Sequence, residues 1–145
     1  MLYSVEEIDQ DHDLYEPTVA MRQTDLYPVG RVTRFYIQDE LEEDSTFVVA
    51  LRNRKLLGCG RLTMDGDKAL FSHIVVGEKH RFNGVGEILL TNMLEASKKK
   101  GAKEISLESP PNTVAFFERF GFTAKGEEKP LGLLDLTAQK MVLTV

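Results

Sequence analysis

The chain has 145 residues, an apolar content of 42% and a formal net charge of -5. This length suits one domain that buries about two thirds of its unfolded surface, and we expect a single domain over residues 1–145. No apolar run approaches the roughly 20 residues of a bilayer-spanning helix, and the acidic N-terminus does not resemble a signal peptide, so we expect a cytoplasmic protein without a membrane partner. A lone Cys59 and three scattered histidines exclude an internal disulfide and argue against a metal site.

The charge is distributed unevenly along the chain. Residues 1–50 hold 12 acids and 3 bases, a balance of -9, whereas residues 51–145 hold 11 acids and 15 bases, a balance of +4. This asymmetry suits a site that receives an anionic ligand from one side and a cationic ligand from the other, although solvated surface charge explains it equally well. No basic stripe with interleaved aromatic residues is present, which argues against a nucleic acid partner.

The first half of the chain predicts a short edge strand, two short helices and then a set of strands. Residues 3–8 fit the strand, and residues 13–27 and 32–41 fit the weakly periodic helices. Two β runs around a polar tip, followed by an Asp-Gly-Asp turn and a third run that ends at Val76, predict a three-stranded antiparallel meander over residues 46–76.

A glycine loop, Arg81-Phe82-Asn83-Gly84-Val85-Gly86, lies between the end of this meander and a helical pattern. Glycines let the backbone approach an anion closely, and the first amides of a helix have no intrahelical acceptor. The helix dipole adds roughly half a positive charge there, and Arg81 adds a full one. The order strand, glycine loop, helix therefore predicts a phosphate site.

The helix that follows runs from Val85 to Lys100 and is closed by Gly101. The rest of the chain reads as a strand at residues 105–107, a short helix at 114–120, a strand at 122–124 and a last strand at 141–145. A helix that crosses between two strands implies a parallel βαβ step. The predicted class is α+β, with a mixed β-sheet that joins the antiparallel meander to this parallel step and is flanked by helices.

Two motifs resemble those of the GNAT family of N-acetyltransferases. Arg81, Gly84 and Gly86 fit the acetyl-coenzyme A loop of that family, Q/R-x-x-G-x-G/A. Downstream, the segment from Asn112 to Phe122 (NTVAFFERFGF) is similar to the family's ending N-x-x-A-x-x-F-Y-E-K-x-G-F, with a shift of about one residue in the loop. The resemblance covers residues 46–145, and residues 1–45 match only as two helices.

The resemblance implies how acetyl-coenzyme A (acetyl-CoA) would bind. The loop residues Arg81, Phe82, Asn83, Gly84, Val85 and Gly86 would hold its pyrophosphate. The backbone of Ile74 and Val76, where the fourth and fifth strands splay apart, would pair with the pantetheine arm like an added strand. The amide of Val76 would also polarise the thioester oxygen. Asn112 would contact the pantetheine, and Phe116 or Phe117 would pack near the sulfur.

The catalytic pattern departs from that of the family. Many members carry a Tyr where this chain has Phe117, and use it to protonate the departing thiolate, which Phe117 cannot do. A thiol of pKa about 8.5 still leaves tolerably as the thiolate near neutral pH. Relatives often carry a base on the fourth strand at the positions of Leu70 and Ser72, and neither residue is a base. Ser72 could instead hold a water molecule that relays the proton.

Two other residues are candidates for the base. Strand alternation places Ser72, Ile74 and Val76 on one face, so His73 should point to the opposite face unless a bulge intervenes. Glu108, at the end of the next strand, is the second candidate. An ordinary structural histidine and a solvent-facing glutamate are the alternatives to these roles.

By the resemblance, the protein is an N-acetyltransferase that moves an acetyl group from acetyl-CoA to a primary amine by direct attack in a ternary complex. No covalent intermediate is expected, because Cys59 lies away from the glycine loop. The acidic first third suggests a cationic acceptor such as a polyamine, an amino sugar or a lysine side chain, and relatives often form homodimers. The alternative is a noncatalytic acyl-CoA-binding or regulatory module that retains the acyl-CoA-binding loop but lacks the catalytic acid and base. No G-x-x-x-x-G-K-[S/T] loop is present, which argues against a phosphotransferase.

Overall fold

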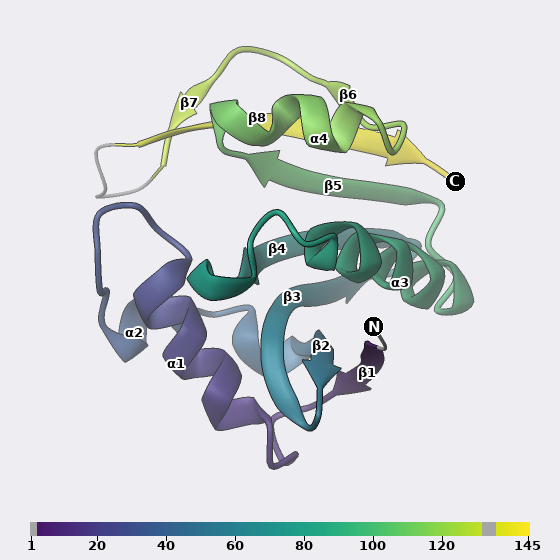
Figure 1. Cartoon of the computed structure of the whole chain (residues 1–145). Helices are drawn as coiled ribbons and strands as arrows, with labels where there is room; N and C mark the ends of the chain where they lie inside the picture. Colours follow the sequence, from purple (N-terminus) through teal and green to yellow (C-terminus); the bar gives the residue numbers. More distant parts are fainter. Residues whose placement is uncertain (1–2, 132–135) are drawn as a thin grey trace.

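The computed structural model describes residues 3–131 and 136–145. Its strands form one mixed sheet in the order β1-β2-β3-β4-β5-β8-β6, and β7 pairs with β8 (Figure 1). The strands are β1 (Ser4–Ile8), β2 (Ser45–Arg52), β3 (Lys55–Asp65), β4 (Lys68–Val76), β5 (Glu104–Ser109), β6 (Thr123–Ala124), β7 (Lys129–Pro130) and β8 (Thr137–Thr144). The helices are α1 (Tyr15–Asp25), α2 (Arg34–Ile37), α3 (Val85–Lys99) and α4 (Val114–Glu118), with 3-10 turns η1 (Glu42–Asp44), η2 (Glu78–His80) and η3 (Pro111–Thr113).

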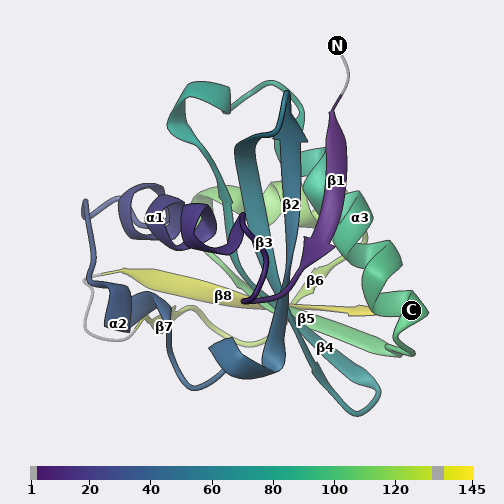
Figure 2. The same cartoon turned by 90° about the horizontal axis from the view of Figure 1, so that it is seen from below.

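The sheet is strongly twisted and has helices on both faces. Figure 2 shows α1 and α3 on opposite sides of the strands β1 to β3. Within the described residues, no helix is long and apolar enough to cross a membrane.

The predicted topology is confirmed. Strands β2, β3 and β4 form an antiparallel meander, and β4 pairs with β5 in parallel after α3 crosses over. Two predicted boundaries differ by several residues from those observed. Helix α2 is only one turn long. After it, the carboxylate of Asp39 accepts a hydrogen bond from the N–H of Leu41 at 3.0 Å, and the turn that this bond forms competes with a longer helix. Strand β8 begins at Thr137, earlier than expected, because its residues from Gln139 to Thr144 pair along the whole of β5 and Thr137 and Ala138 pair with β7.

Helix α3 and helix α4 cover one face of the sheet. The buried stripe of α3 includes Leu89, Leu90 and Met93, and it packs with β-strand residues and with Phe117 of α4 in one apolar cluster. Gly60 permits this contact, because a Cβ there would lie 2.4 Å from the sulfur of Met93. The core on this face therefore fixes α3, and with it the glycine loop, against β3 and β4.

Helix α1 covers the opposite face through a smaller apolar cluster. That cluster joins Tyr15 and Val19 of α1 to Phe47 of β2, Cys59 of β3 and Val75 of β4. Cys59 is fully buried, and burial raises the pKa of its thiol to about 12.

Strand β4 contains a bulge that overturns the predicted alternation of its side chains. Arg61 pairs with Ser72 and Cys59 pairs with Val75, so Gly60 alone lies opposite both His73 and Ile74. His73 has a positive φ of 50°, which is uncommon for a residue other than glycine. The prediction that His73 points away from Ser72 is therefore wrong, because the extra residue places both side chains on the α1 face.

Candidate active site

The glycine loop meets the start of α3 as predicted. Gly84 adopts a left-handed φ of 81°, and within the described chain no side chain caps the helix that begins at Val85. The first amides of α3 are therefore open to an anion. Phe82 is fully exposed. The Arg81 guanidinium donates to the carbonyl oxygens of Val76 (3.3 Å) and Asp25 (3.0 Å), so it ties the loop to β4 and to the end of α1 while staying exposed.

An opening between β4 and β5 leads away from this loop. The two strands pair in parallel only as far as Phe71 and Leu107. The N–H of Gly77 donates to the carbonyl of Leu57 at the end of β3, 2.8 Å away. Because successive amides of a strand point to alternate sides, the N–H groups of Val76 and Ile74 face the opening instead.

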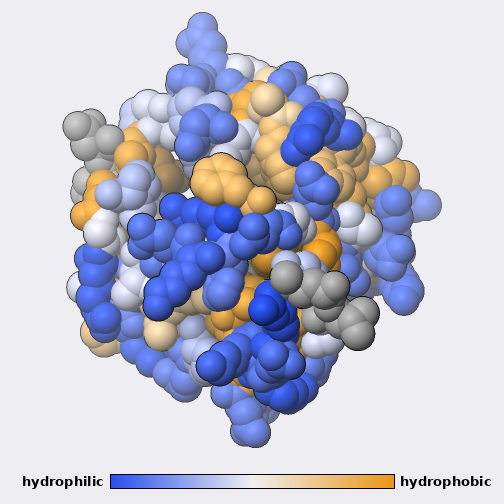
Figure 3. All heavy atoms as spheres, viewed as in Figure 1, coloured by the Kyte–Doolittle hydropathy of each residue, from blue (hydrophilic) through white to orange (hydrophobic). Residues whose placement is uncertain are grey.

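The first turn of α3 borders the same opening. A Cβ built on Gly86 would lie 3.6 Å from the ring of Phe116 and 3.9 Å from Val76. Phe116 is half-buried, whereas Phe117 is 6% exposed and packs on Phe116 and Phe122 in the core. Asn112 is exposed in η3, at the start of the segment that leads into α4. In Figure 3, an apolar area lies near α4 and polar residues cover most of the middle of the same face.

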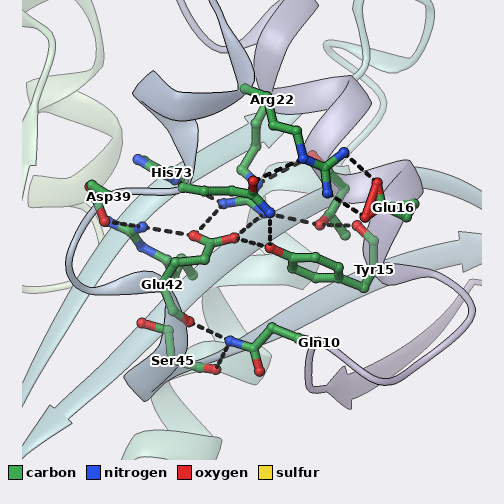
Figure 4. A network of polar contacts seen from close by, with 12 residues as sticks. Gln10, Tyr15, Glu16, Arg22, Asp39, Glu42, Ser45 and His73 are labelled. Atoms are coloured by element: carbon green, nitrogen blue, oxygen red, sulfur yellow. Dashed lines mark hydrogen bonds and ion pairs between the residues drawn. The ribbon is translucent and has the colours of Figure 1, made fainter.

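A buried network of charged side chains lies on the α1 face of the sheet (Figure 4). Arg22 of α1 binds both carboxylate oxygens of Glu42 in η1, at 2.9 and 2.7 Å. Tyr15 donates its hydroxyl to the same carboxylate at 2.7 Å. The side chains of Arg22 and Glu42 are 0% and 5% exposed, so the pair is almost completely removed from water.

Arg61 of β3 extends this network to the strand that carries the bulge. Its Nη1 donates to Glu42 at 2.9 Å and to Asp39 at 2.8 Å, and its Nε donates to the hydroxyl of Ser72 at 2.9 Å. Burial alone would raise the pKa of Glu42, but the hydrogen bonds from Arg22 and Tyr15 more than offset this and lower it. The pKa of Asp39 is likewise lowered, because the hydrogen bond and charge of Arg61 outweigh its burial.

His73 joins the network through Arg22. The distance between Arg22 Nη1 and His73 Nδ1 is 3.1 Å. Burial, together with the charges of Arg61 and Arg22, lowers the pKa of His73 to about 3. The imidazole is therefore neutral near pH 7.

Glu108 lies across the opening from Ser72. It follows Leu107, the last residue of β5 that pairs with β4, just as Ser72 follows Phe71. Phe71 and Leu107 both point into the apolar cluster under α3, so alternation turns Ser72 and Glu108 toward the α1 face. Glu108 is exposed.

A pocket of about 660 Å³ opens beside the buried network on the α1 side. Its lining holds four acids and no base: Gln10, Tyr15, Gln38, Asp39, Glu40, Glu42 and Glu43. Through Arg61, the carboxylates of Asp39 and Glu42 connect this pocket to Ser72.

The structure brings most of the predicted site residues together along one opening. Ser72, Ile74 and Val76 lie on β4, Glu108 on the facing strand β5, and Gly86 and Phe116 at the end of the opening near the loop. Two predicted residues lie apart from it: the side chain of His73 contacts Arg22 in the buried network, and Phe117 lies in the core. Sequence reasoning missed the network of Arg22, Asp39, Glu42 and Arg61. One signal was available: Tyr15, Val19 and Arg22 lie on one face of a helix at i, i+4 and i+7, so an apolar stripe there ends on a cation.

Known proteins resemble this chain in sequence and in fold. A family model described as an acetyltransferase (GNAT) domain matches residues 26–143. The chain is 30% identical over 91 residues to the uncharacterized N-acetyltransferase YjcF of Bacillus subtilis, a match that covers 63% of this chain and 65% of that protein, just under two thirds of its length.

Two solved structures share the fold. An acyl-CoA N-acyltransferase from Pseudomonas aeruginosa matches with a TM-score of 0.82 and 19% identity, over 97% of this chain and 99% of that one. A GNAT family acetyltransferase from Elizabethkingia anophelis with acetyl-CoA bound matches with a TM-score of 0.75 and 14% identity, over 99% of this chain and 98% of that one.

Proposed function

Because the chain belongs to the GNAT acetyltransferase family, we propose that it is an N-acetyltransferase that moves an acetyl group from acetyl-CoA directly to a primary amine. We further propose that one domain over residues 1–145 carries this activity, and that the acceptor is a cationic small molecule or a lysine side chain. The observation that carries the proposal is the opening between β4 and β5, which presents two backbone N–H groups and runs to the uncapped start of α3.

Acetyl-CoA would lie along this opening. The backbone of residues 81–86 would hold the pyrophosphate, because the loop and the first turn of α3 present amides that no side chain occupies. The N–H groups of Ile74 and Val76 would pair with the pantetheine, and the Val76 amide would polarise the thioester oxygen. The missing Cβ of Gly86 leaves room between Val76 and Phe116 for the arm to pass. Asn112 and Phe116 would contact it from the side of α4.

The amine must lose a proton to attack. An alkyl ammonium of pKa about 10.4 is neutral in only roughly one part in 10³ at pH 7, which is equivalent to about 4 kcal/mol of barrier. Glu108 is the exposed carboxylate at the opening on the acceptor side, and it would accept this proton directly or through a water molecule held by Ser72.

The reaction then needs no covalent enzyme intermediate. The amine nitrogen bonds to the acetyl carbon as the carbon–sulfur bond breaks, and the thiolate takes its proton from water because Phe117 has no hydroxyl. Cys59 does not compete as a nucleophile, since it is buried and its thiol has a raised pKa.

The acidic pocket supports a cationic acceptor. Of the four carboxylates that line it, Asp39 and Glu42 are bound to Arg22 and Arg61. The attraction for an ammonium or polyammonium ion would therefore come mainly from the exposed Glu40 and Glu43, which would also disfavour an anionic amine. Because Arg61 links the pocket wall to Ser72, a substrate in the pocket would lie on the side of the sheet where Ser72 and Glu108 face.

An assay of thiol release from acetyl-CoA with a panel of amines tests the proposal. We expect turnover with polyamines, amino sugars or lysine peptides, above the rate of acetyl-CoA hydrolysis without amine. We also expect Glu108→Gln to lower kcat by roughly 10²-fold while calorimetry shows unchanged acetyl-CoA binding. Activity only on anionic amines would refute the acceptor class. Tight acetyl-CoA binding without turnover on any amine would favour the noncatalytic module, an alternative that Phe117 and the low pKa of His73 support.

A further inference from the structure

We infer that His73 is a positioning residue and not the general base: its Nδ1 accepts a hydrogen bond from Arg22, and this contact holds the bulge that sets which amides of β4 face the opening. The inference rests on the proposed function for its effect on the reaction, but its structural content can be measured without any turnover.

The direction of the hydrogen bond fixes the tautomer of the imidazole. A guanidinium has only donors, so at a separation of 3.1 Å between Arg22 Nη1 and His73 Nδ1 the imidazole nitrogen must be the acceptor. A neutral imidazole with its lone pair at Nδ1 carries its proton at Nε2. A proton added to the ring would have to enter at Nδ1, where it would meet the N–H of Arg22.

The charges around His73 also oppose a second proton. Two cations face it, Arg22 from α1 and Arg61 from β3, and both are buried. Two carboxylates, Asp39 and Glu42, also act on the ring, but both are already bound to these arginines. A general base must take up a proton during the reaction, and this environment resists that step.

The contact with Arg22 acts on the backbone at a position of strain. His73 has a φ of 50°, and the bulge at His73 and Ile74 inverts the alternation of β4. Before the bulge, Phe71 faces α3, and after it Ile74 and Val76 do. By holding the side chain of His73 against α1, Arg22 stabilises the register in which the amides of Ile74 and Val76 face the opening.

Two substitutions of His73 distinguish the role of Nδ1 from that of Nε2. Asn places its amide oxygen near the position of Nδ1 and tolerates a left-handed φ, so His73→Asn keeps the acceptor for Arg22 and removes Nε2. Gln reaches the position of Nε2 but has no acceptor at Nδ1, and it tolerates the positive φ less well. His73→Asn is thus the conservative variant and His73→Gln its matched counterpart.

Nitrogen-15 NMR of the imidazole rings tests the tautomer in the free protein. The chain has three histidines, and the resonances that disappear in His73→Asn identify His73. We expect a pyridine-like shift at Nδ1, a pyrrole-like shift at Nε2, and no titration of this ring between about pH 5 and 8. A protonated Nδ1, or a ring that titrates in this range, would overturn the inference whether or not the protein is an enzyme.

Steady-state kinetics and calorimetry test the positioning role. We expect His73→Asn to keep kcat and its pH profile, and His73→Gln to raise both the KM and the Kd for acetyl-CoA by roughly tenfold or more, because it misplaces the amides of β4. A loss of roughly 100-fold or more in kcat in His73→Asn, with unchanged acetyl-CoA binding, would identify His73 as the base instead. If the parent shows no turnover, the proposed function fails, and the calorimetric comparison with the NMR result still decides the role of His73.

Discussion

Glu42 accepts hydrogen bonds from Arg22, Arg61 and Tyr15, although its side chain is only 5% exposed. Removing such charges from water is costly, and their mutual attraction roughly offsets that cost only when every partner is present. The network is therefore poor evidence for extra stability, but it connects α1, η1, β3 and β4 at one point. It also contacts Ser72, which precedes the bulge in β4, and His73, which lies in the bulge.

Removal of the shared carboxylate tests the buried network. Glu42→Gln leaves Arg22 and Arg61 buried without their common counter-ion, so we expect the free energy of unfolding to fall by about 3 kcal/mol or more. Urea titration measures this. The neighbouring Glu43 is exposed, and we expect Glu43→Gln to change stability by less than about 0.5 kcal/mol. Equal effects of the two substitutions would contradict the described network.

The second test concerns the pH dependence of stability. The pKa of His73 is about 3 in the folded protein against an ordinary value of 6.5. Below pH 6.5 the unfolded chain binds a proton that the folded chain does not, so stability falls as the pH falls from 6.5 toward 3. The slope is at most about 1.4 kcal/mol per pH unit. Glu42 and Asp39, whose pKa values are lowered, lose their contributions only at still lower pH, below their ordinary values near 4.

We expect urea titrations of the parent between about pH 7 and 5 to show this loss, and His73→Asn to show a smaller one. A parent whose stability does not change in this range, or a variant with the same slope, would mean that His73 takes up a proton as easily in the folded protein as in the unfolded chain.

Individual site residues were predictable from the sequence where they belong to a short contiguous motif. The loop glycines and the pair Phe116 and Phe117 follow from motifs in contiguous sequence, and in the structure Gly86 lies beside Phe116 while Phe117 is in the core. The role of Glu42 was not predictable, because an acidic run between two elements is usually solvated surface. Its burial depends on Arg22 and Arg61, which are 20 and 19 residues away. The only indication of this burial was the position of the arginines: Arg22 shares a helix face with Val19, and Arg61 lies between Cys59 and Thr63 in β3.

Among the helices and strands, the meander, the crossover helix and the parallel step were all predictable from periodicity and turn residues. The bulge in β4 was not. The bulge is defined by the pairing with β3, where Gly60 lies opposite both His73 and Ile74. The alternation of residues in β4 alone does not indicate the register in which β4 pairs with β3.

Hydrogen exchange tests the direction of the β4 amides. Gly77 donates to β3, and alternation gives Val75 the same direction, whereas Ile74 and Val76 face the opening. We expect saturating acetyl-CoA to slow exchange at Ile74 and Val76 and to leave Val75 and Gly77 nearly unchanged, as measured by residue-resolved NMR. Uniform protection of all four amides would indicate general stabilisation without strand-like pairing.

The space at the first turn of α3 gives a second test. Gly86→Ala adds a methyl group at ordinary contact distance from Phe116 and Val76, so it should change stability by less than about 1 kcal/mol and, because it only narrows the gap, weaken acetyl-CoA binding by less than roughly threefold. Gly86→Leu fills the gap between Val76 and Phe116, and should weaken binding by roughly tenfold or more in calorimetry. If Gly86→Leu binds as well as Gly86→Ala, the arm of acetyl-CoA does not pass through this gap.

For the whole molecule, the sheet separates two chemically different sides. The uncapped start of α3 and the glycine loop suit an anionic ligand, and the acidic pocket on the α1 side suits a cation. The uneven charge along the chain, -9 in residues 1–50 and +4 in residues 51–145, therefore corresponds in part to two sides of the fold. The opening between β4 and β5 lies between them, and it is where the proposed reaction would take place.

A crystal structure of the protein with CoA tests whether the ligand lies along the opening between β4 and β5. We expect the pyrophosphate at the amides of residues 81–86, the pantetheine along Ile74 and Val76, and the sulfur at the β4–β5 opening with Ser72 and Glu108 on the acceptor side. CoA bound elsewhere, or a sulfur that points away from Glu108 and the acidic pocket, would contradict the proposed donor and acceptor sides.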